Sequence, residues 1–184
     1  LAHATATVAN GGVAYRPHLG MFTTDVMTRE RHPTVLEEPQ NLGFKKANVD
    51  VIKRAMVGVT QGGTGTRVFA GARYVSGGKT GTAQAVTIGQ KDKYNSKKLE
   101  EHQRDHALYI AFAPAEDPRI AVAVIVENAG WGAGVAAPIA RRVFDYWLNG
   151  EYPSEEDLAA VRKGQATAPI GKPRRVEDIP LTAP

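Results

Sequence analysis

The sequence predicts an α+β fold in which helices pack against an antiparallel sheet. Three apolar segments with strand character, around Lys79 and at residues 107–113 and 120–127, account for the sheet. Two stretches with apolar residues at helical spacing, beginning near Asn48 and Gly134, account for helices that cover it. The 184 residues, 42% of them hydrophobic, suit one domain or a large part of one.

The N-terminal region combines a helix with short strands. Residues 1–10 are rich in alanine, and the sequence Asn10-Gly11-Gly12 ends this helix in the manner of a glycine C-cap. Residues 14–16 and 18–26 predict short strands that a proline separates. Residues 29–46 are polar and contain two prolines, so we expect a surface excursion there.

A second helix is predicted from Asn48, which suits the N-cap position, with Asp50 near the positive end of the helix dipole. Its apolar stripe comprises Val49, Ile52, Ala55, Met56 and Val59. The glycine-rich run 61–66 ends the helix. This run lacks both the Lys-Ser/Thr of a P-loop and the preceding strand of a dinucleotide fingerprint, so nucleotide binding is set aside.

The second half holds a charged segment, two strands and the clearest helix. Residues 91–106 are charged and have room for a short helix, and the turn 114–118 joins two neighbouring antiparallel strands. Helical spacing over residues 134–149 places Arg141 and Arg142 opposite an apolar face, and Gly150 ends the helix. The predicted apolar face comprises Val135, Ile139, Val143, Phe144 and Trp147.

The composition changes after Gly150. Five prolines interleave with charged and small residues from Glu151 to Pro184, although residues 157–163 have room for one or two helical turns. Such a segment buries too little apolar surface to offset the entropy of ordering. We therefore expect a domain part at 1–150 and a mostly flexible tail at 151–184.

Composition also excludes several classes of function. The net charge is +4, but the basic residues are scattered and form no aromatic-basic platform, so no nucleic-acid partner is expected. The chain has no cysteine, and no further metal ligand accompanies His102 and His106, which are four residues apart. Neither a metal nor another cofactor is therefore expected. No apolar run approaches the ~20 residues of a membrane helix. The start at Leu1, within a predicted helix, is what we expect of a fragment.

The stretch around Lys79 carries the candidate chemistry. On a strand, Thr80 and Thr82 place both hydroxyl groups on one face, beside the cation of Lys79. Gly81 removes a side chain where another backbone is expected to come close, and Gly77-Gly78 suggest a flexible approach. A cation, two hydroxyls and a bare strand edge suit the carboxylate of a peptide-like ligand, whereas the alternative is an ordinary glycine-rich turn.

This stretch also resembles a known family. Lys79-Thr80-Gly81 matches the third motif of the penicillin-recognising serine enzymes, and residues 78–84 resemble its form in class B penicillin-binding proteins. Residues 104–107, leading into 111–114, are similar to the penicillin-binding protein 2 group, the elongation transpeptidases, and so are residues 126–128. The resemblance runs from Leu1 to about Gly150, and it implies the C-terminal part of a transpeptidase domain.

The resemblance implies a peptidoglycan D,D-transpeptidase that acts on stem peptides ending in D-Ala-D-Ala and binds β-lactams. It assigns the electrostatics of the site to Lys79, the substrate carboxylate to the hydroxyls of Thr80 and Thr82, and an oxyanion donor to the N–H of Thr82. The edge of the strand that includes Gly81 would pair with the substrate main chain. A membrane-anchored parent protein on the periplasmic face of the inner membrane, within the cell-elongation complex, is also implied.

The nucleophilic serine of that family is missing. Ser76-x-x-Lys79 matches the family's S-x-x-K formally, but two glycines between these residues disfavour the helical turn that the motif needs. Ser96 and Ser154 lack a lysine three residues later. We therefore expect that this chain alone is not acylated by a β-lactam.

Two alternatives stay open: a non-catalytic penicillin-recognising sensor and a serine β-lactamase. The charged segment and the similarities that follow it disfavour both. Asp105 and His106 are expected to order the segment before the next strand, with a role beside the cleft as the alternative. Trp131 either shapes the cleft or caps the last helix, and capping is favoured.

Overall fold

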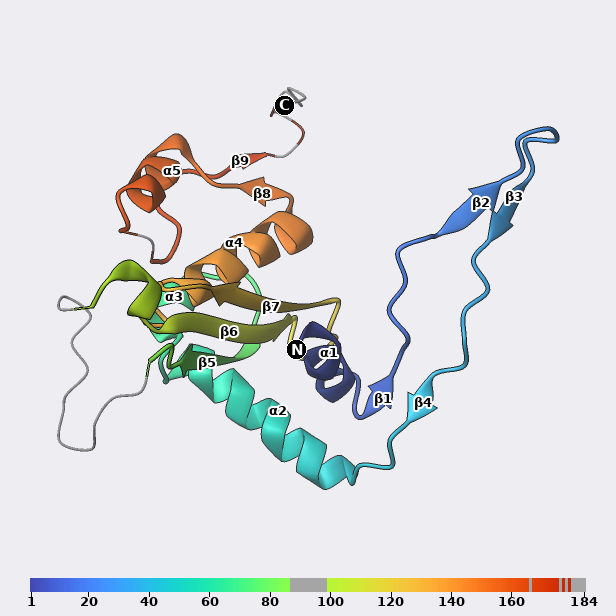
Figure 1. Cartoon of the computed structure of the whole chain (residues 1–184), viewed down its shortest axis with the longest axis horizontal. Helices are drawn as coiled ribbons and strands as arrows, with labels where there is room; N and C mark the ends of the chain where they lie inside the picture. The colour runs from blue at the N-terminus through green and yellow to red at the C-terminus, as the bar shows by residue number, and fades with distance from the viewer. Residues whose placement is uncertain (87–98, 166, 176, 178, 180–184) are drawn as a thin grey trace.

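The computed structural model describes residues 1–86, 99–165, 167–175, 177 and 179 (Figure 1). Residues 91–98 of the predicted charged segment, including Ser96, lie outside the described residues. What is described of this segment holds a single turn of 3-10 helix, Glu101–Gln103. No helix in the described part of the chain is both long and apolar enough to cross a lipid bilayer.

A three-stranded antiparallel sheet forms the centre of the molecule. Its strands are β5 (Gly77–Ala83), β6 (His106–Ala113) and β7 (Ile120–Val126), with β6 in the middle. Tyr109 of β6 lies opposite Thr80 on one side and opposite Val124 on the other. The predicted antiparallel sheet of three strands and the α+β class are confirmed.

Helix α4 (Ala136–Asn149) covers one face of this sheet, and the short helix α3 (Thr66–Phe69) lies beside it (Figure 1). Small side chains let α4 approach the sheet closely. The buried cluster between these elements consists of Val68, Phe69, Ala107, Tyr109, Ala111, Ala113, Ala136, Ala137, Ala140 and Phe144.

The predicted apolar face of α4 is only partly right: Phe144 is fully buried and Val135 packs against the core, but the other three residues do not. Ile139, Val143 and Trp147 are 43%, 38% and 63% exposed, whereas Arg141 is only 6% exposed. Arg141 tolerates burial because its guanidinium pairs with Asp145, at 2.8 and 3.0 Å, and also donates to two backbone carbonyls. The sequence-based prediction looked for large apolar side chains at helical spacing. It therefore missed the alanines and the Arg141–Asp145 pair, which form much of the buried face.

Helices α1 (Ala2–Ala9) and α2 (Lys46–Gln61) pack against other parts of the sheet. The start of α2 differs from the prediction: Lys45 occupies the N-cap position without a side-chain cap, and Asn48 lies inside the helix. At the other end of α2, the Thr60 hydroxyl donates to the carbonyl of Ser76 at 2.7 Å, which ties the helix to the start of β5.

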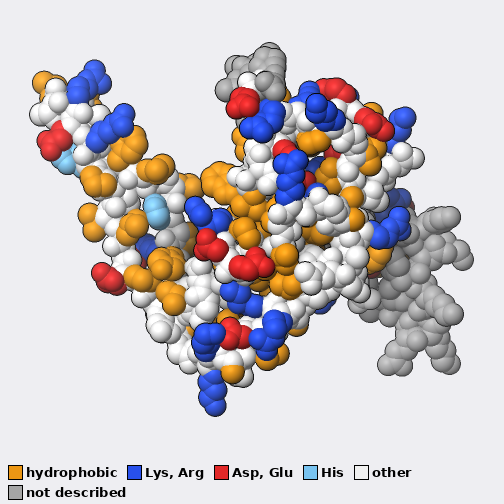
Figure 2. Space-filling view, turned by 180° about the vertical axis from the view of Figure 1, so that it is seen from behind, with side chains coloured by type: hydrophobic (Ala, Val, Ile, Leu, Met, Phe, Trp, Pro, Cys, Tyr) orange, Lys and Arg blue, Asp and Glu red, His pale blue; other side chains and the backbone are white. Residues whose placement is uncertain are grey.

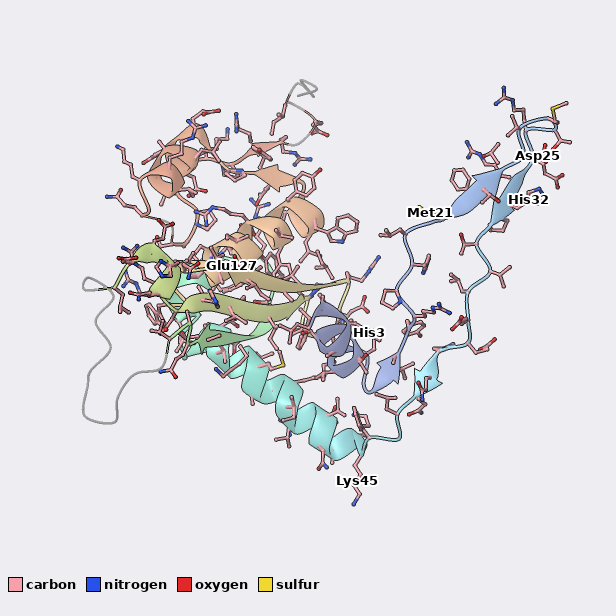
Figure 3. All side chains as sticks on the ribbon, in the orientation of Figure 1. His3, Met21, Asp25, His32, Lys45 and Glu127 are labelled. Atoms are coloured by element: carbon pink, nitrogen blue, oxygen red, sulfur yellow. The ribbon has the colours of Figure 1, made fainter. Side chains whose placement is uncertain are left out.

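Between α1 and α2 the chain forms an arm that projects from the body (Figure 1). It is built from two pairs of short strands, β1 (Val13–Ala14) with β4 (Gln40–Asn41) and β2 (Phe22–Thr24) with β3 (Arg31–Pro33). Figure 3 shows Asp25 at the tip, where its carboxylate accepts hydrogen bonds from the backbone N–H groups two and three residues later in the turn. The predicted surface excursion is confirmed, with shorter strands than expected.

The arm carries exposed apolar side chains, several of which are visible from behind (Figure 2). The most exposed are Leu19, Met27, Val35, Met21 and Val26. Only Val35 falls within residues 29–46, for which a polar composition was expected, and the other four precede that stretch.

The segment after Gly150 has more structure than expected. It contains β8 (Glu151–Tyr152), helix α5 (Glu155–Arg162) and β9 (Arg174–Arg175), which pairs with β8. An ion pair between Arg142 and Asp157 joins α5 to α4, and a contact of this kind leaves no apolar stripe in the sequence that would predict it. The boundary of the functional domain at residue 150 stays a prediction.

Candidate active site

The candidate site lies on β5, at one edge of the sheet in the described part of the chain. Thr80 and Thr82 lie opposite Tyr109 and Ala107, so alternation places both threonines on one face of the strand. Thr82 is exposed and Thr80 is half-buried. Because alternate residues of an antiparallel edge strand direct N–H and C=O groups away from the sheet, this edge offers backbone donors and acceptors to a ligand.

Lys79 alternates onto the other face of β5, yet its ammonium group returns to the strand. The side chain is exposed, and Nζ donates to the backbone carbonyl of Thr80 at 2.5 Å. The ammonium group therefore lies beside the backbone of Thr80, and an anion-binding region shared by Lys79 and the threonine hydroxyls stays a prediction.

The close backbone approach expected at Gly81 is present, but the missing side chain that permits it belongs to Gly132. A Cβ atom on Gly132 would lie 2.5 Å from the carbonyl oxygen of Gly81 and 2.3 Å from that of Leu108. A Cβ on Gly81 itself would meet only the Cβ of Leu108, at 3.2 Å. The loop before α4 therefore rests on the backbone of β5 and β6 at the centre of the candidate site.

Gly77 and Gly78 do not form the flexible approach that the sequence suggested. Both are buried residues of β5, and aromatic rings lie over them. A Cβ on Gly78 would lie 2.1 Å from the hydroxyl oxygen of Tyr109, and one on Gly77 would lie 2.6 Å from the ring of Phe112. These glycines are needed because the rings occupy the space of a side chain.

Tyr109 lies beneath the site with a buried hydroxyl. Its side chain is 1% exposed, and its oxygen has no hydrogen-bond partner among the residues that the structure describes. Burial raises the pKa of Tyr109, so the ring stays neutral over the physiological range. The hydroxyl of Tyr74 instead donates to Asp145 at 2.9 Å, and burial followed by the Asp145 charge raises the pKa of Tyr74.

A residue that sequence reasoning missed also reaches the site. Thr64 lies in the glycine-rich loop between α2 and α3, and its hydroxyl is 3.1 Å from the hydroxyl of Thr80. In the sequence, Thr64 is recognisable only as a threonine within the glycine-rich run 61–66. That run was considered only as a possible phosphate-binding loop.

The described serines do not provide a nucleophile paired with a lysine. Ser76 is 1% exposed and is followed by the extended strand β5, so Ser76 and Lys79 are not one helical turn apart. Ser154 is the N-cap of α5, where its hydroxyl accepts from Asp157 N and donates to the carbonyl of Ile170. Both observations agree with the rejection of these residues from sequence.

The family "Penicillin binding protein transpeptidase domain" matches residues 1–145. The chain belongs to this family. It is 39% identical to the peptidoglycan D,D-transpeptidase MrdA of Haemophilus influenzae, over 85% of this chain and 24% of the relative. It is 44% identical to MrdA of Acinetobacter baumannii, over 80% of this chain and 22% of the relative. The chain thus spans about a quarter of the length of these curated relatives.

Solved structures of penicillin-binding proteins share the fold. The ceftriaxone acyl-enzyme of penicillin-binding protein A from Mycobacterium tuberculosis is 32% identical, with a TM-score of 0.64 over 80% of this chain and 31% of that one. PBP2 of Pseudomonas aeruginosa, in complex with WCK 5153, is 35% identical, with a TM-score of 0.55 over 78% of this chain and 28% of that one. The recognition of a class B penicillin-binding protein of the penicillin-binding protein 2 group is confirmed.

In this member of the family, Asn128 orders the segment that precedes β6. Asn128 has a left-handed backbone, with φ of 56°, and its side-chain amide donates to the carbonyls of His102 and Arg104. Its backbone N–H donates to Nδ1 of His106 at 3.0 Å, and Asp105 O accepts from Gly130 N at 2.7 Å. His106 pairs with Ala83 at the end of β5. These contacts support the ordering role expected of Asp105 and His106.

Trp131 contributes to the start of α4 through its backbone. Its carbonyl accepts hydrogen bonds from the N–H groups of Gly134 and Val135, whereas its indole is 63% exposed. Trp131 therefore forms part of the turn before α4, whose N-cap is Val135, and the roles considered for its indole stay predictions. The described part of the chain contains no cluster of three or more residues suited to bind a metal ion.

Proposed function

We propose that this chain supplies the substrate-binding strand of a peptidoglycan D,D-transpeptidase that works through an acyl-serine intermediate. The observation that carries the proposal is the arrangement on β5, where Lys79, Thr80 and Thr82 border an open strand edge. Membership of the transpeptidase family and the identity to MrdA relatives support it.

In the proposed complex, the stem peptide binds as an added strand along the edge of β5. The hydroxyls of Thr80 and Thr82 bind the terminal carboxylate of D-Ala-D-Ala, and Lys79 supplies positive charge beside them. The backbone N–H of Thr82 donates to the oxyanion that forms when the serine attacks. A β-lactam occupies the same positions with its own carboxylate and carbonyl group.

The nucleophile in this proposal comes from residues outside the given sequence. Ser76 is buried at the start of an extended strand, Ser154 caps α5, and the chain spans only about a quarter of its MrdA relatives. The apolar stripe exposed on α4, which includes Ile139 and Trp147, supports further elements of the domain that pack there.

The relatives support part of the proposed setting. Acyl-enzyme structures of the Mycobacterium tuberculosis protein support binding of β-lactams here. A solved complex joins PBP2 and MreC of Helicobacter pylori, and we place the parent of this chain in a comparable cell-elongation complex. We further propose that the parent protein is anchored in the inner membrane and acts on its periplasmic face.

Acylation by labelled benzylpenicillin tests the proposal. The chain of residues 1–184 and a complete transpeptidase domain that contains it are each incubated with the label, digested and mapped by mass spectrometry. We expect an adduct on the complete domain at a serine outside residues 1–184, and none on the chain alone. An adduct on Ser76 would contradict the proposal.

The same domain is then given a stem peptide and an amine acceptor. Formation of the cross-linked peptide is the expected result. Rapid hydrolysis of the penicillin without cross-linking would identify a serine β-lactamase, and stable binding without either reaction would identify a sensor.

A further inference from the structure

We infer that Thr64 is a positioning residue for the substrate carboxylate: its hydroxyl fixes the direction in which the Thr80 hydroxyl donates. This inference rests on the proposed function and adds a residue to it. The geometry that carries it is the 3.1 Å contact between Thr64 Oγ1 and Thr80 Oγ1.

The backbone holds the loop of Thr64 firmly. Gly65 N donates to the carbonyl of Val59 in α2, and Thr66 N donates to the carbonyl of Gly63. Gly63 packs so tightly on α2 that an added Cβ would lie 2.9 Å from the Cα of Val59. Residues on both sides of Thr64 are therefore anchored, and the loop presents the Thr64 hydroxyl to β5 in a fixed position.

The same helix end is tied to β5 at a second point. Thr60 donates to the carbonyl of Ser76 at 2.7 Å, and four residues later along both segments Thr64 meets Thr80. The contact between Thr60 and Ser76 fixes the position of the strand. The contact between Thr64 and Thr80 involves one of the hydroxyl groups of the site. This pairing makes Thr64 part of the support of β5 rather than a loose side chain on a loop.

The direction of the hydrogen bond follows from the ligand. A hydroxyl has one hydrogen to donate and two lone pairs, and a carboxylate only accepts. If Thr80 donated to Thr64, it would have no hydrogen left for the substrate. With a carboxylate bound, Thr64 therefore donates to Thr80, and Thr80 donates to the carboxylate, in a chain of two hydrogen bonds that polarise each other.

The contact distinguishes the two threonines of the site. Among the described residues, Thr80 has a side-chain hydroxyl as its partner, whereas no such partner contacts the hydroxyl of Thr82. We infer that Thr80 enters the reaction with its hydroxyl already oriented and that Thr82 becomes oriented when the ligand binds. Loss of Thr64 should then affect only ligands that carry the carboxylate.

The test measures the second-order rate of acylation of the complete domain with two probes, benzylpenicillin and its methyl ester, which lacks the charged carboxylate. Thr64→Val is expected to slow acylation by benzylpenicillin about five- to tenfold, the effect of one hydrogen bond, and acylation by the ester less than about twofold. Thr64→Ser keeps the hydroxyl and should restore the rate. Thr34→Val removes a comparable hydroxyl contact in the arm, to the carbonyl of Gly20, and serves as the control.

Thermal melting of each variant is recorded in parallel. An unchanged benzylpenicillin rate in Thr64→Val, or equal loss with both probes, would overturn the inference while leaving the proposed function in place. Failure of Thr64→Ser to recover the rate would also overturn it. If the unmodified domain reacts with neither probe, the proposed function fails and this inference fails with it.

Discussion

Gly132 lies against the backbone of Gly81, so close that a Cβ atom on Gly132 would be 2.5 Å from the Gly81 carbonyl oxygen. The loop that leads into α4 and the strand that carries the candidate site are therefore in direct backbone contact. This contact makes the position of β5 depend on a residue about fifty positions later in the chain.

The contact predicts that Gly132→Ala destabilises the domain. Because the colliding atoms are backbone oxygens of Gly81 and Leu108, the strands or the loop must shift, and we expect a loss of about 1–3 kcal/mol in the free energy of unfolding. Gly134→Ala is the matched control, since its Cβ would lie 3.5 Å from the Trp131 ring. Urea denaturation measures both variants, and equal stability of the two would refute the close contact.

The buried Tyr109 and the partly buried Tyr74 are expected to differ in how loss of the hydroxyl changes stability. Tyr109→Phe removes a buried hydroxyl without a partner among the described residues, so stability should stay the same or rise by up to about 1 kcal/mol. Tyr74→Phe removes a hydrogen bond to Asp145 and should cost about 1.5–3 kcal/mol. Thermal unfolding of both variants checks this, and a larger loss for Tyr109→Phe would contradict the assignment.

The ion pair between α4 and α5 predicts that the segment after Gly150 contributes to stability. Arg142 donates to both carboxylate oxygens of Asp157, at 2.9 and 2.6 Å, and Asp157 is 1% exposed. Asp157→Ala leaves the guanidinium without its partner and should cost about 3–5 kcal/mol. Glu155→Ala breaks a pair in which the carboxylate side chain is 75% exposed, and should cost less than about 1 kcal/mol.

The same pair of variants tests the proposed boundary at residue 150. If residues 151–184 lie outside the functional domain, Asp157→Ala should melt earlier yet be acylated by penicillin at the rate of the unmodified domain. If Asp157→Ala is acylated more slowly than the unmodified domain at temperatures well below its melting temperature, residues 151–184 help to shape the site.

The arrangement of the sheet was predictable because alternation and turn chemistry are local. The pairing of β6 with β7 follows from the short turn at 114–118, and the shared face of Thr80 and Thr82 follows from their spacing. The role of Gly78 was not predictable in this way. It depends on the ring of Tyr109, about thirty residues later, and nothing near Gly78 in the sequence shows that the ring lies over it.

The buried face of α4 shows a second limit of sequence patterns. Phe144 is buried as predicted, but Ile139 and Trp147 are exposed in this chain, and alanines and the paired Arg141 complete the buried face. The position of Thr64 was equally inaccessible, because a hydroxyl contact between a loop and a strand leaves no periodic pattern. Long-range contacts of small or polar residues decide both features.

The most direct test of the central claim compares acylation with stability for two variants on β5. Lys79→Ala and Thr82→Val in the complete domain should slow acylation by fluorescent penicillin by an amount equivalent to about 2–4 kcal/mol in the transition state. Because both side chains are exposed, the melting temperature should change little. Thr24→Val, on an exposed strand of the arm, should leave both quantities unchanged. Unchanged acylation in Lys79→Ala and Thr82→Val, or a loss of stability as large as the loss of acylation, would contradict the claim that β5 binds the substrate.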